Sequence, residues 1–318
     1  MHGTGKPSVK WSGRNEGGLT GVRMFTRFSL MTGPRLGPPL LAIGTWFAVP
    51  FLKTRRAGSE LFYTQLRGKR VGYLRRLWDT YQQFLAFTLC WHERTYAFVK
   101  GADFLSLDVK GEEHLANARK QGRPIVLLTA HMSNFELGAW LLSQNHRGLD
   151  PNNAPPVVNM VMVETEVESV RQYLATLRGA IQPRIIAVNA SPLSSLAILA
   201  ALRRNEIVCM QGDRATGSQS TLVPFLGREA PFPIGPYQLA RLSNAVVLPT
   251  LCRRLGRARY EFEIFEPIDA ADDHAAAARY AQILEAEARA RPSYWFNLFS
   301  FWEDSHAPSA EPSIRRAS

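Results

Sequence analysis

Apolar runs alternate with amphipathic stretches along the last two thirds of the chain. Aliphatic and β-branched runs with the length of a buried strand occupy residues 125–130, 157–163, 184–188, 207–210, 245–251 and 259–265. Apolar residues recur at helical spacing around them, which predicts helices at 73–98, 112–120, 135–144, 166–178, 193–203 and 272–289, and one that begins near Gly235. Strands separated by helices of this length are typical of βαβ units, so we expect an α/β fold with a mostly parallel sheet flanked by helices.

Two segments interrupt this alternation. Residues 211–233 predict a long loop, and long loops in compact α/β domains usually carry function. Residues 292–302, PSYWFNLFSFW, concentrate aromatic side chains around Asn297. This cluster predicts either a hydrophobic plug that closes the core or the wall of a cleft for an acyl chain or a glycolipid.

An uncharged stretch near the N-terminus, residues 36–52, lies between groups of basic residues. As a helix it would span about 25 Å, which is shorter than the roughly 30 Å hydrocarbon core of a bilayer, and its three prolines weaken a helix further. Basic flanks with Trp46 and Phe47 between them predict a peripheral or re-entrant membrane anchor, with a true span as the alternative. A secretory signal is not expected, because the apolar run starts late and no cleavage site of small residues follows it.

Composition limits the classes of function. A chain of 318 residues with 46% hydrophobic content predicts one catalytic domain at 71–305, preceded by a membrane-associating extension at 1–70 and followed by a disordered tail at 306–318. The formal net charge of +11 favours an anionic partner. Nucleic acid is not expected, because no zinc-finger spacing, RNP-like run or basic zipper is present, and an anionic membrane surface or an acidic carrier protein fits better. Three cysteines far apart in apolar runs predict neither disulfides nor a zinc site, which fits a reducing cytosolic face.

The strongest candidate for chemistry is residues 124–140, PIVLLTAHMSNFELGAW, where a strand ends before His131 and Glu136 lies in the first turn of the next helix. In such a turn Glu136 would accept a hydrogen bond from one imidazole nitrogen and leave the other free to take a proton. The first N–H groups of the helix would stabilise an oxyanion. Ser133 and Glu136 also form the pattern of a capping box, in which Glu136 bonds back to the Ser133 N–H, so a purely structural role stays open.

Three features in chain order resemble the lysophospholipid acyltransferase superfamily, and within it the bacterial lipid A late-acyltransferase branch and a related group of predicted acyltransferases. They are the H-x4-E signature from His131 to Glu136, the run 206–254 with its GDR, VPFLGR, FPIGP, LAR and VVLP segments, and the Pro-x-Tyr-Trp-Phe-Asn close at 292–297. The resemblance covers about residues 11–303 and implies a fold similar to that of glycerol-3-phosphate acyltransferase. Residues 158–168, VNMVMVETEVE, lack the arginine that lipid A acyltransferases commonly carry there, which speaks against a lipid A precursor as acceptor.

The resemblance implies an acyltransferase in which His131 is the general base, oriented by Glu136. It would move a fatty acyl chain from a thioester of acyl carrier protein or coenzyme A to a hydroxyl or amine of a lipid or glycolipid, with no cofactor or metal. We expect it at the cytoplasmic face of a bacterial inner membrane, attached peripherally or by one N-terminal anchor. The residues expected to contact substrate are Asn134, Asp213, Arg214, Phe225, Gly227 and Arg228.

Other classes of enzyme fit less well. No G-x-S-x-G elbow is present, which disfavours a covalent serine hydrolase, and the second histidine of H-E-x-x-H is missing, which argues against a zinc enzyme. Two alternatives stay open. One is a non-catalytic membrane-surface binding protein with the same fold, and the other is an acyltransferase for an amino-acid lipid or a polyene product.

Overall fold

A seven-stranded sheet organises the C-terminal part of the computed structural model, which describes residues 18–144, 156–163, 172–173, 176–177, 183–188, 193–215 and 219–302. Its strands are β1 (Ser106–Lys110), β2 (Ile125–Thr129), β3 (Val158–Val163), β4 (Arg184–Val188), β5 (Ile207–Gln211), β8 (Val246–Gly256) and β9 (Arg259–Ile264). They lie in the order β1-β9-β8-β2-β5-β3-β4, and neighbours are parallel except β8 and β9. The predicted α/β fold with a mostly parallel sheet is confirmed.

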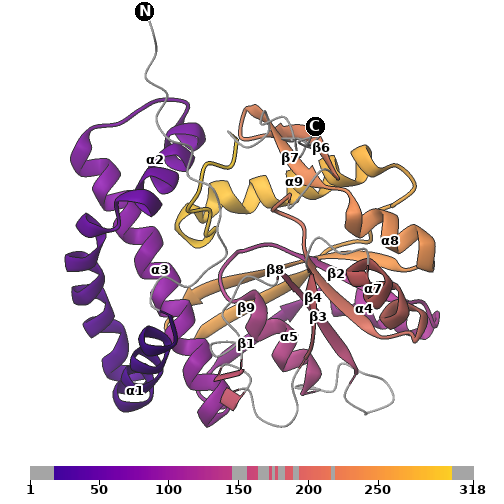
Figure 1. Cartoon of the computed structure of the whole chain (residues 1–318), viewed down its shortest axis with the longest axis horizontal. Coiled ribbons are helices and arrows are strands. Elements are labelled where there is room, and N and C mark those ends of the chain that lie inside the picture. Colours follow the sequence, from indigo (N-terminus) through magenta and orange to yellow (C-terminus); the bar gives the residue numbers. More distant parts are fainter. Residues whose placement is uncertain are drawn as a thin grey trace, which may run out of the picture.

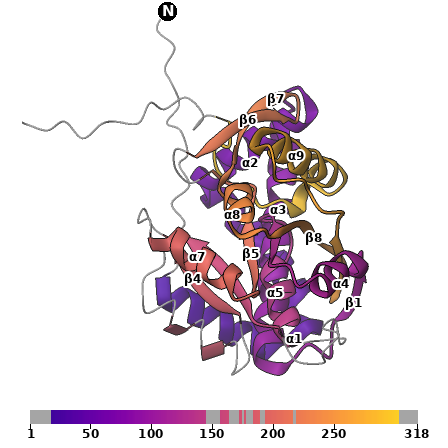
Figure 2. The ribbon, with the colours of Figure 1, turned by 90° about the vertical axis from the view of Figure 1, so that its right-hand side faces the viewer.

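Helices cover both faces of the sheet, which explains why its central strands are apolar throughout. Val126 and Leu128 of β2 point into a core shared with α7 (Leu193–Arg203), α8 (Gly235–Ser243) and α9 (Asp273–Ala290). Ile125 and Leu127 point to the opposite face, which is covered by α4 (Glu112–Lys120) and α5 (Phe135–Ser143). In Figure 1, α9 lies above the strands, and in Figure 2, α4 and α5 lie in the lower half of the molecule, away from α9.

The prediction of a long loop after β5 is wrong in part, because this segment contains a hairpin of β6 (Ser220–Phe225) and β7 (Arg228–Pro233). Leu226 and Gly227 form its two-residue turn with φ of 53° and 82°, as a type I′ hairpin requires. The Leu226 N–H donates to Glu285 of α9, which fixes the turn against that helix. The sequence hid the hairpin because its strands contain prolines, which are disfavoured inside sheets.

Two further differences concern short or peripheral elements. Strand β1 was not predicted, because it is a five-residue edge strand whose side chains alternate between exposed and half-buried. Strand β8 continues to Gly256, five residues beyond its predicted end. Most of the predicted helix at 166–178 and the predicted tail lie outside the described residues.

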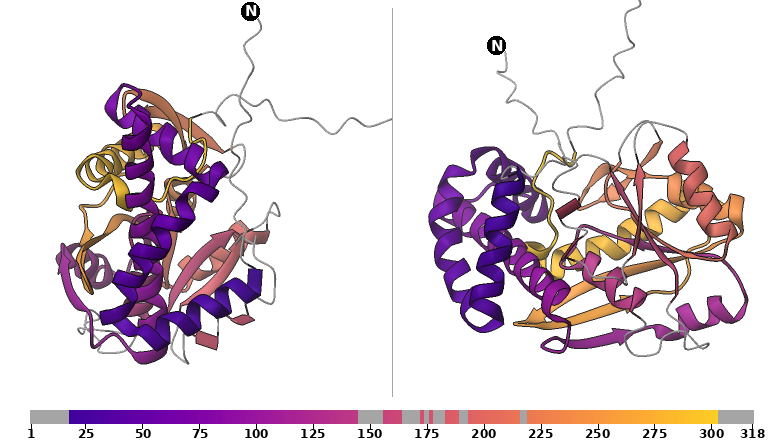
Figure 3. Two further views of the ribbon diagram at one scale, coloured as in Figure 1. Left: turned by 90° about the vertical axis from the view of Figure 1, so that its left-hand side faces the viewer. Right: turned by 60° about the horizontal axis from the view of Figure 1, so that its bottom comes forward.

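The N-terminal region forms a block of helices beside the sheet (Figures 1 and 3), composed of α1 (Gly18–Ala48), the short η1 (Val49–Phe51), α2 (Lys53–Arg67) and α3 (Tyr73–Lys100). Helix α1 kinks at Gly33, whose φ is 59°. The His92 Nε2–H of α3 donates to the Gly33 carbonyl at 3.0 Å. One turn later, a Cβ on Gly37 would lie 2.3 Å from the same imidazole, so only glycine permits α1 to approach α3 this closely.

The same block packs directly against the aromatic segment 292–302. A Cβ on Gly58 of α2 would lie 2.4 Å from the Phe299 backbone nitrogen, and Val49, Phe84 and Leu298 form a small apolar cluster. The predicted boundary near residue 70 falls in the connection between α2 and α3. No single helix among the described residues is long and apolar enough to cross a membrane, although Gly18–Phe51 and Arg55–Arg67, bent by 96°, meet that test as a pair.

Candidate active site

The site lies where β2 and β5 end, at the carboxyl edge of the parallel sheet, the place where ligands bind in open α/β folds. Thr129 and Gln211 are the last register partners of these two strands. Two residues further along each chain, His131 and Asp213 continue the register as a bonded pair. His131 Nδ1 is 2.8 Å from Asp213 Oδ1, and the His131 backbone N–H donates to Asp213 Oδ2 at 3.0 Å.

Electrostatics give the pair a defined protonation state. Burial opposes ionisation of Asp213, but the nearby His131 and Arg214, together with the indole of Trp295, outweigh it and hold the pKa of Asp213 at about 2. Burial, followed by the charge of Arg214, lowers the pKa of His131 below its usual 6.5, and Asp213 opposes that shift. At neutral pH the carboxylate is therefore ionised and the imidazole neutral. Nδ1 must carry the hydrogen that Asp213 accepts, so Nε2 is left with its lone pair.

Glu136 does not make the hydrogen bond that the sequence predicted for it. It forms an ion pair with Arg94 of α3, in which Nη1 and Oε1 are 2.5 Å apart. Asp213 holds the His131 ring instead, and it reaches the ring from 82 residues further along the chain. Glu136 remains close enough for its charge to raise the pKa of His131 slightly against the larger effect of burial.

The capping-box interpretation is also contradicted. Helix α5 begins at Phe135 with Asn134 as its N-cap, and no side chain caps it. The Ser133 N–H, which the box would give to Glu136, donates to the Tyr294 carbonyl at 2.9 Å. Ser133 Oγ accepts from the Arg254 N–H at 3.3 Å.

The aromatic segment 292–302, called here the aromatic close, forms one wall of the site. The Trp295 indole N–H donates to Asp213 Oδ2 at 3.0 Å, and the Phe296 N–H donates to the His131 carbonyl at 2.9 Å. Trp295 is 1% exposed and lies within an aromatic cluster beside Phe225 and Phe301. The segment therefore closes the core and, at the same time, holds the His131 turn and its carboxylate from behind.

Asn134, predicted to contact substrate, is only 1% exposed. Its amide donates to the Cys90 carbonyl at 2.9 Å and to the Tyr260 oxygen at 3.0 Å. The Tyr260 hydroxyl in turn donates to Glu93, which binds the Arg254 guanidinium through both carboxylate oxygens at 2.7 and 2.9 Å. Asn134 therefore belongs to a buried hydrogen-bond network that supports the His131 turn. Its amide hydrogens are already bonded inside the protein.

The other predicted contact residues fall into two groups. Arg214 is partly exposed beside His131, donates to the Phe296 carbonyl at 3.0 Å, and lies 5.1 Å above the Phe299 ring. Burial lowers the pKa of Arg214 to about 10, which leaves it charged at neutral pH. Phe225, in contrast, is fully buried beneath Trp295, and Gly227 and Arg228 lie at the hairpin turn. Only Asp213 and Arg214 of this set are brought to His131.

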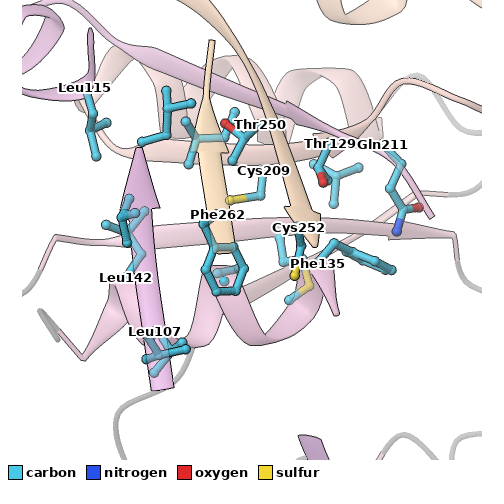
Figure 4. A pocket seen from close by; sticks show the side chains of 18 residues that line it. Leu107, Leu115, Thr129, Phe135, Leu142, Cys209, Gln211, Thr250, Cys252 and Phe262 are labelled. Carbon is cyan, nitrogen blue, oxygen red and sulfur yellow. The ribbon is translucent and has the colours of Figure 1, made fainter. Parts of the chain in front are cut away.

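An apolar cavity of about 90 Å³ opens beside the site, between the sheet and α5. Phe135 links the two, because its ring lies 5.6 Å from the His131 ring and also lines the cavity. In Figure 4, Phe135 and Gln211 lie at one end, Leu115 and Leu142 at the other, and Phe262 between them. Residues 292–302 contribute no lining residue to this cavity. No cluster of three or more His, Cys, Asp or Glu suited to a metal occurs in the described part of the chain.

Comparison with known proteins points to one chemistry. A model of the bacterial lipid A biosynthesis acyltransferase family matches residues 89–303. The phosphatidylinositol mannoside acyltransferase of Mycobacterium tuberculosis is 26% identical over 214 residues, which are 65% of this chain and 63% of that protein. The protein of the same name from Mycolicibacterium smegmatis is 26% identical over 46% of this chain and 45% of its own length. This chain thus matches less than two thirds of the length of these relatives.

Among solved structures, the 1-acyl-sn-glycerophosphate acyltransferase of Thermotoga maritima is similar to 80% of this chain and 98% of its own. Its sequence identity is 12% and its TM-score 0.35.

Proposed function

Because the chain belongs to the bacterial lipid A biosynthesis acyltransferase family, we propose that it transfers a fatty acyl chain from a thioester to a hydroxyl or amine of a lipid or glycolipid. The observation that carries this proposal is the His131–Asp213 pair beside an apolar cavity. Asp213 fixes the ring tautomer, and the lowered pKa of His131 keeps Nε2 able to accept a proton at neutral pH. These are the requirements of a general base.

The reaction follows from that arrangement. His131 Nε2 takes the proton of the acceptor hydroxyl or amine as its oxygen or nitrogen attacks the thioester carbonyl carbon. The new bond forms while the carbonyl electrons move to oxygen, and Asp213 stabilises the imidazolium. When the tetrahedral intermediate collapses, the C–S bond breaks and the thiolate recovers the proton from Nε2. No acyl-enzyme is needed, and the three cysteines are buried.

Each substrate has a region suited to it. The apolar cavity between α5 and the sheet suits the alkyl chain chemically, because its lining is almost entirely hydrocarbon. Arg214 provides a positive charge beside His131 for a phosphate, either of the acceptor or of the phosphopantetheine arm shared by acyl carrier protein and coenzyme A. A glycolipid acceptor is favoured over an amino-acid lipid or a polyene product, because the matching relatives are named for acylation of phosphatidylinositol mannoside.

Attachment to an anionic membrane surface completes the proposal. Large apolar side chains stand exposed along α1 and η1, among them Met31, Phe47 and Phe51 at 86%, 68% and 82%. Basic residues accompany them in the sequence, and the whole chain carries a formal charge of +11. Apolar side chains combined with basic ones favour binding in the plane of an anionic bilayer, at the cytoplasmic face of the inner membrane, where a lipid acceptor is available.

The decisive experiment is acyl transfer by the purified full chain, with acyl carrier protein or coenzyme A as donor and cell lipids as acceptor. H131A is expected to abolish product while leaving vesicle binding intact. H274A is the matched control, because His274 hydrogen-bonds Thr221 at the surface, away from the site. Full turnover by H131A would refute the catalytic proposal, and vesicle binding without turnover by the unchanged protein would favour the non-catalytic alternative. Lipid mass spectra of cells with and without the protein would identify the acceptor from the mass of one acyl chain.

A further inference from the structure

Side chains of β2 and β5 form successive layers at and below the carboxyl edge of the sheet, and the two lower layers face the cavity. The His131–Asp213 pair forms the first layer, at the edge. Thr129 and Gln211 form the second, and Leu127 and Cys209 form the third. Both of these lower layers line the cavity. Because a strand advances about 3.3 Å per residue, successive layers are roughly 6.6 Å apart. The proposed base, the polar layer and the hydrocarbon layer therefore follow one another within about 13 Å along the strands.

The polar layer is unusual within this cavity. Thr129, Gln211 and Thr250 are the lining residues with a hydroxyl or an amide, and all others are apolar or cysteine. The Thr250 hydroxyl donates to the Leu248 carbonyl of its own strand. The half-buried Gln211 carboxamide has no hydrogen-bond partner in the described part of the chain. Its side chain is only partly buried, so the amide is open to a hydrogen bond from water or from a ligand in the cavity.

We propose that the Gln211 carboxamide donates an N–H to the thioester carbonyl oxygen and stabilises the oxyanion of the tetrahedral intermediate. The inference rests on the proposed acyl transfer and adds a catalytic residue to it. With the acceptor proton at His131 and the alkyl chain against the third layer, the carbonyl lies at the level of Gln211. When the acceptor attacks, negative charge collects on that oxygen, and the Gln211 N–H stabilises it without itself gaining or losing a proton.

The position of Gln211 supports this assignment over a structural one. Figure 4 shows its carboxamide at the end of the cavity marked by Phe135, whose ring contacts His131. Gln211 also lies two residues before Asp213 on the same chain, so the strand that positions the carboxylate positions the donor as well. The competing donors are the first N–H groups of α5, which no side chain caps.

The first test is the kinetics of Q211L and Q211E. Both remove the N–H donor, and both are expected to lower kcat by about 10² to 10³ while KM changes little, because the bond strengthens as charge develops. Q238L is the matched control, because the amide of Gln238 on α8 donates a hydrogen bond to Asp273 on α9. A kcat within threefold of the unchanged protein for Q211L would overturn the proposal and assign the oxyanion to the α5 amides.

A second measurement separates the donor role from simple packing. Two inert donor analogues are compared, a ketone in which CH2 replaces the thioester sulfur and an alkyl thioether that lacks the carbonyl. Q211L is expected to weaken binding of the ketone and leave the thioether unchanged. Equal weakening of both would contradict the proposal. This binding test does not need turnover, so it distinguishes failure of the Gln211 assignment from failure of the acyltransferase function, which H131A tests.

Discussion

At the scale of single residues, His131 lies between two charges that act on it in opposite directions. Burial and the Arg214 guanidinium lower its pKa, while Asp213 raises it. The net shift is downward, which makes His131 a weaker base than a free imidazole but keeps it unprotonated at neutral pH. Asp213 thus contributes orientation and stabilises the imidazolium, and Arg214 limits how strongly the proton is held.

This balance predicts a pH profile and two opposite shifts. For the unchanged protein, kcat/KM is expected to rise with pH, and the midpoint of this acid limb is expected below the usual histidine pKa of about 6.5. R214Q removes a charge that disfavours imidazolium, so its acid limb should move to higher pH. D213N removes a charge that favours imidazolium, so its limb should move to lower pH, with a large loss of rate because the tautomer is no longer fixed. Shifts in the same direction in both variants would contradict this account.

At the scale of elements, α5 carries a glycine where helices prefer alanine. A glycine inside a helix costs roughly 0.5 to 1 kcal/mol relative to alanine, so Gly138 requires a packing reason. The reason is Phe262 of β9, since a Cβ at position 138 would lie 2.6 Å from its Cε1 atom. Phe262 lies between the two ends of the cavity in Figure 4. Phe262 also lines the cavity, so the contact between α5 and β9 shapes the middle of the cavity wall.

Acyl-chain preference should respond to this contact. G138A is expected to push the Phe262 ring into the cavity and shift the products toward shorter chains, whereas F262L should admit longer ones. The measurement is the chain-length distribution of products from a mixture of donors that all compete. Transfer from the shortest donor serves as the control for intact catalysis. Unchanged distributions in both variants would show that the chain lies elsewhere.

Much of this architecture was predictable from the sequence, because buried strands and amphipathic helices carry strong periodic signals. The six predicted strands and the helices over 112–120 and 193–203 are present in the structure. The hairpin of β6 and β7 was hidden by its prolines. The His131 turn was also predictable from its strand-to-helix signature, but its carboxylate was not. Glu136 is near in sequence, whereas Asp213 becomes a neighbour only through the pairing of β2 with β5. The same pairing places Gln211, which no local motif marks.

At the scale of the whole molecule, the apolar and basic features of the N-terminal block favour vesicle binding. The triple variant M31D/F47D/F51D should reduce sedimentation with anionic vesicles, because these exposed side chains would otherwise enter the interface. Binding by the unchanged protein should also fall with added salt. The matched control is L222D/L242D/L255D, which changes exposed leucines of the C-terminal unit. If the control weakens binding equally, α1 and η1 are not the attachment surface.

The hydrogen bonds from Tyr294, Trp295 and Phe296 to the His131 turn and to Asp213 also set an order of events during synthesis. Helices α1 to α3 leave the ribosome first, and about 200 residues separate the end of α3 from Trp295. At roughly 5 to 20 residues per second, this interval lasts on the order of 10 to 40 s. During that time the nascent chain already presents its apolar N-terminal surface, but its base lacks the wall that fixes it. Under the proposed function, membrane attachment through α1 and η1 therefore precedes catalysis, which requires that residues 292–302 be translated first.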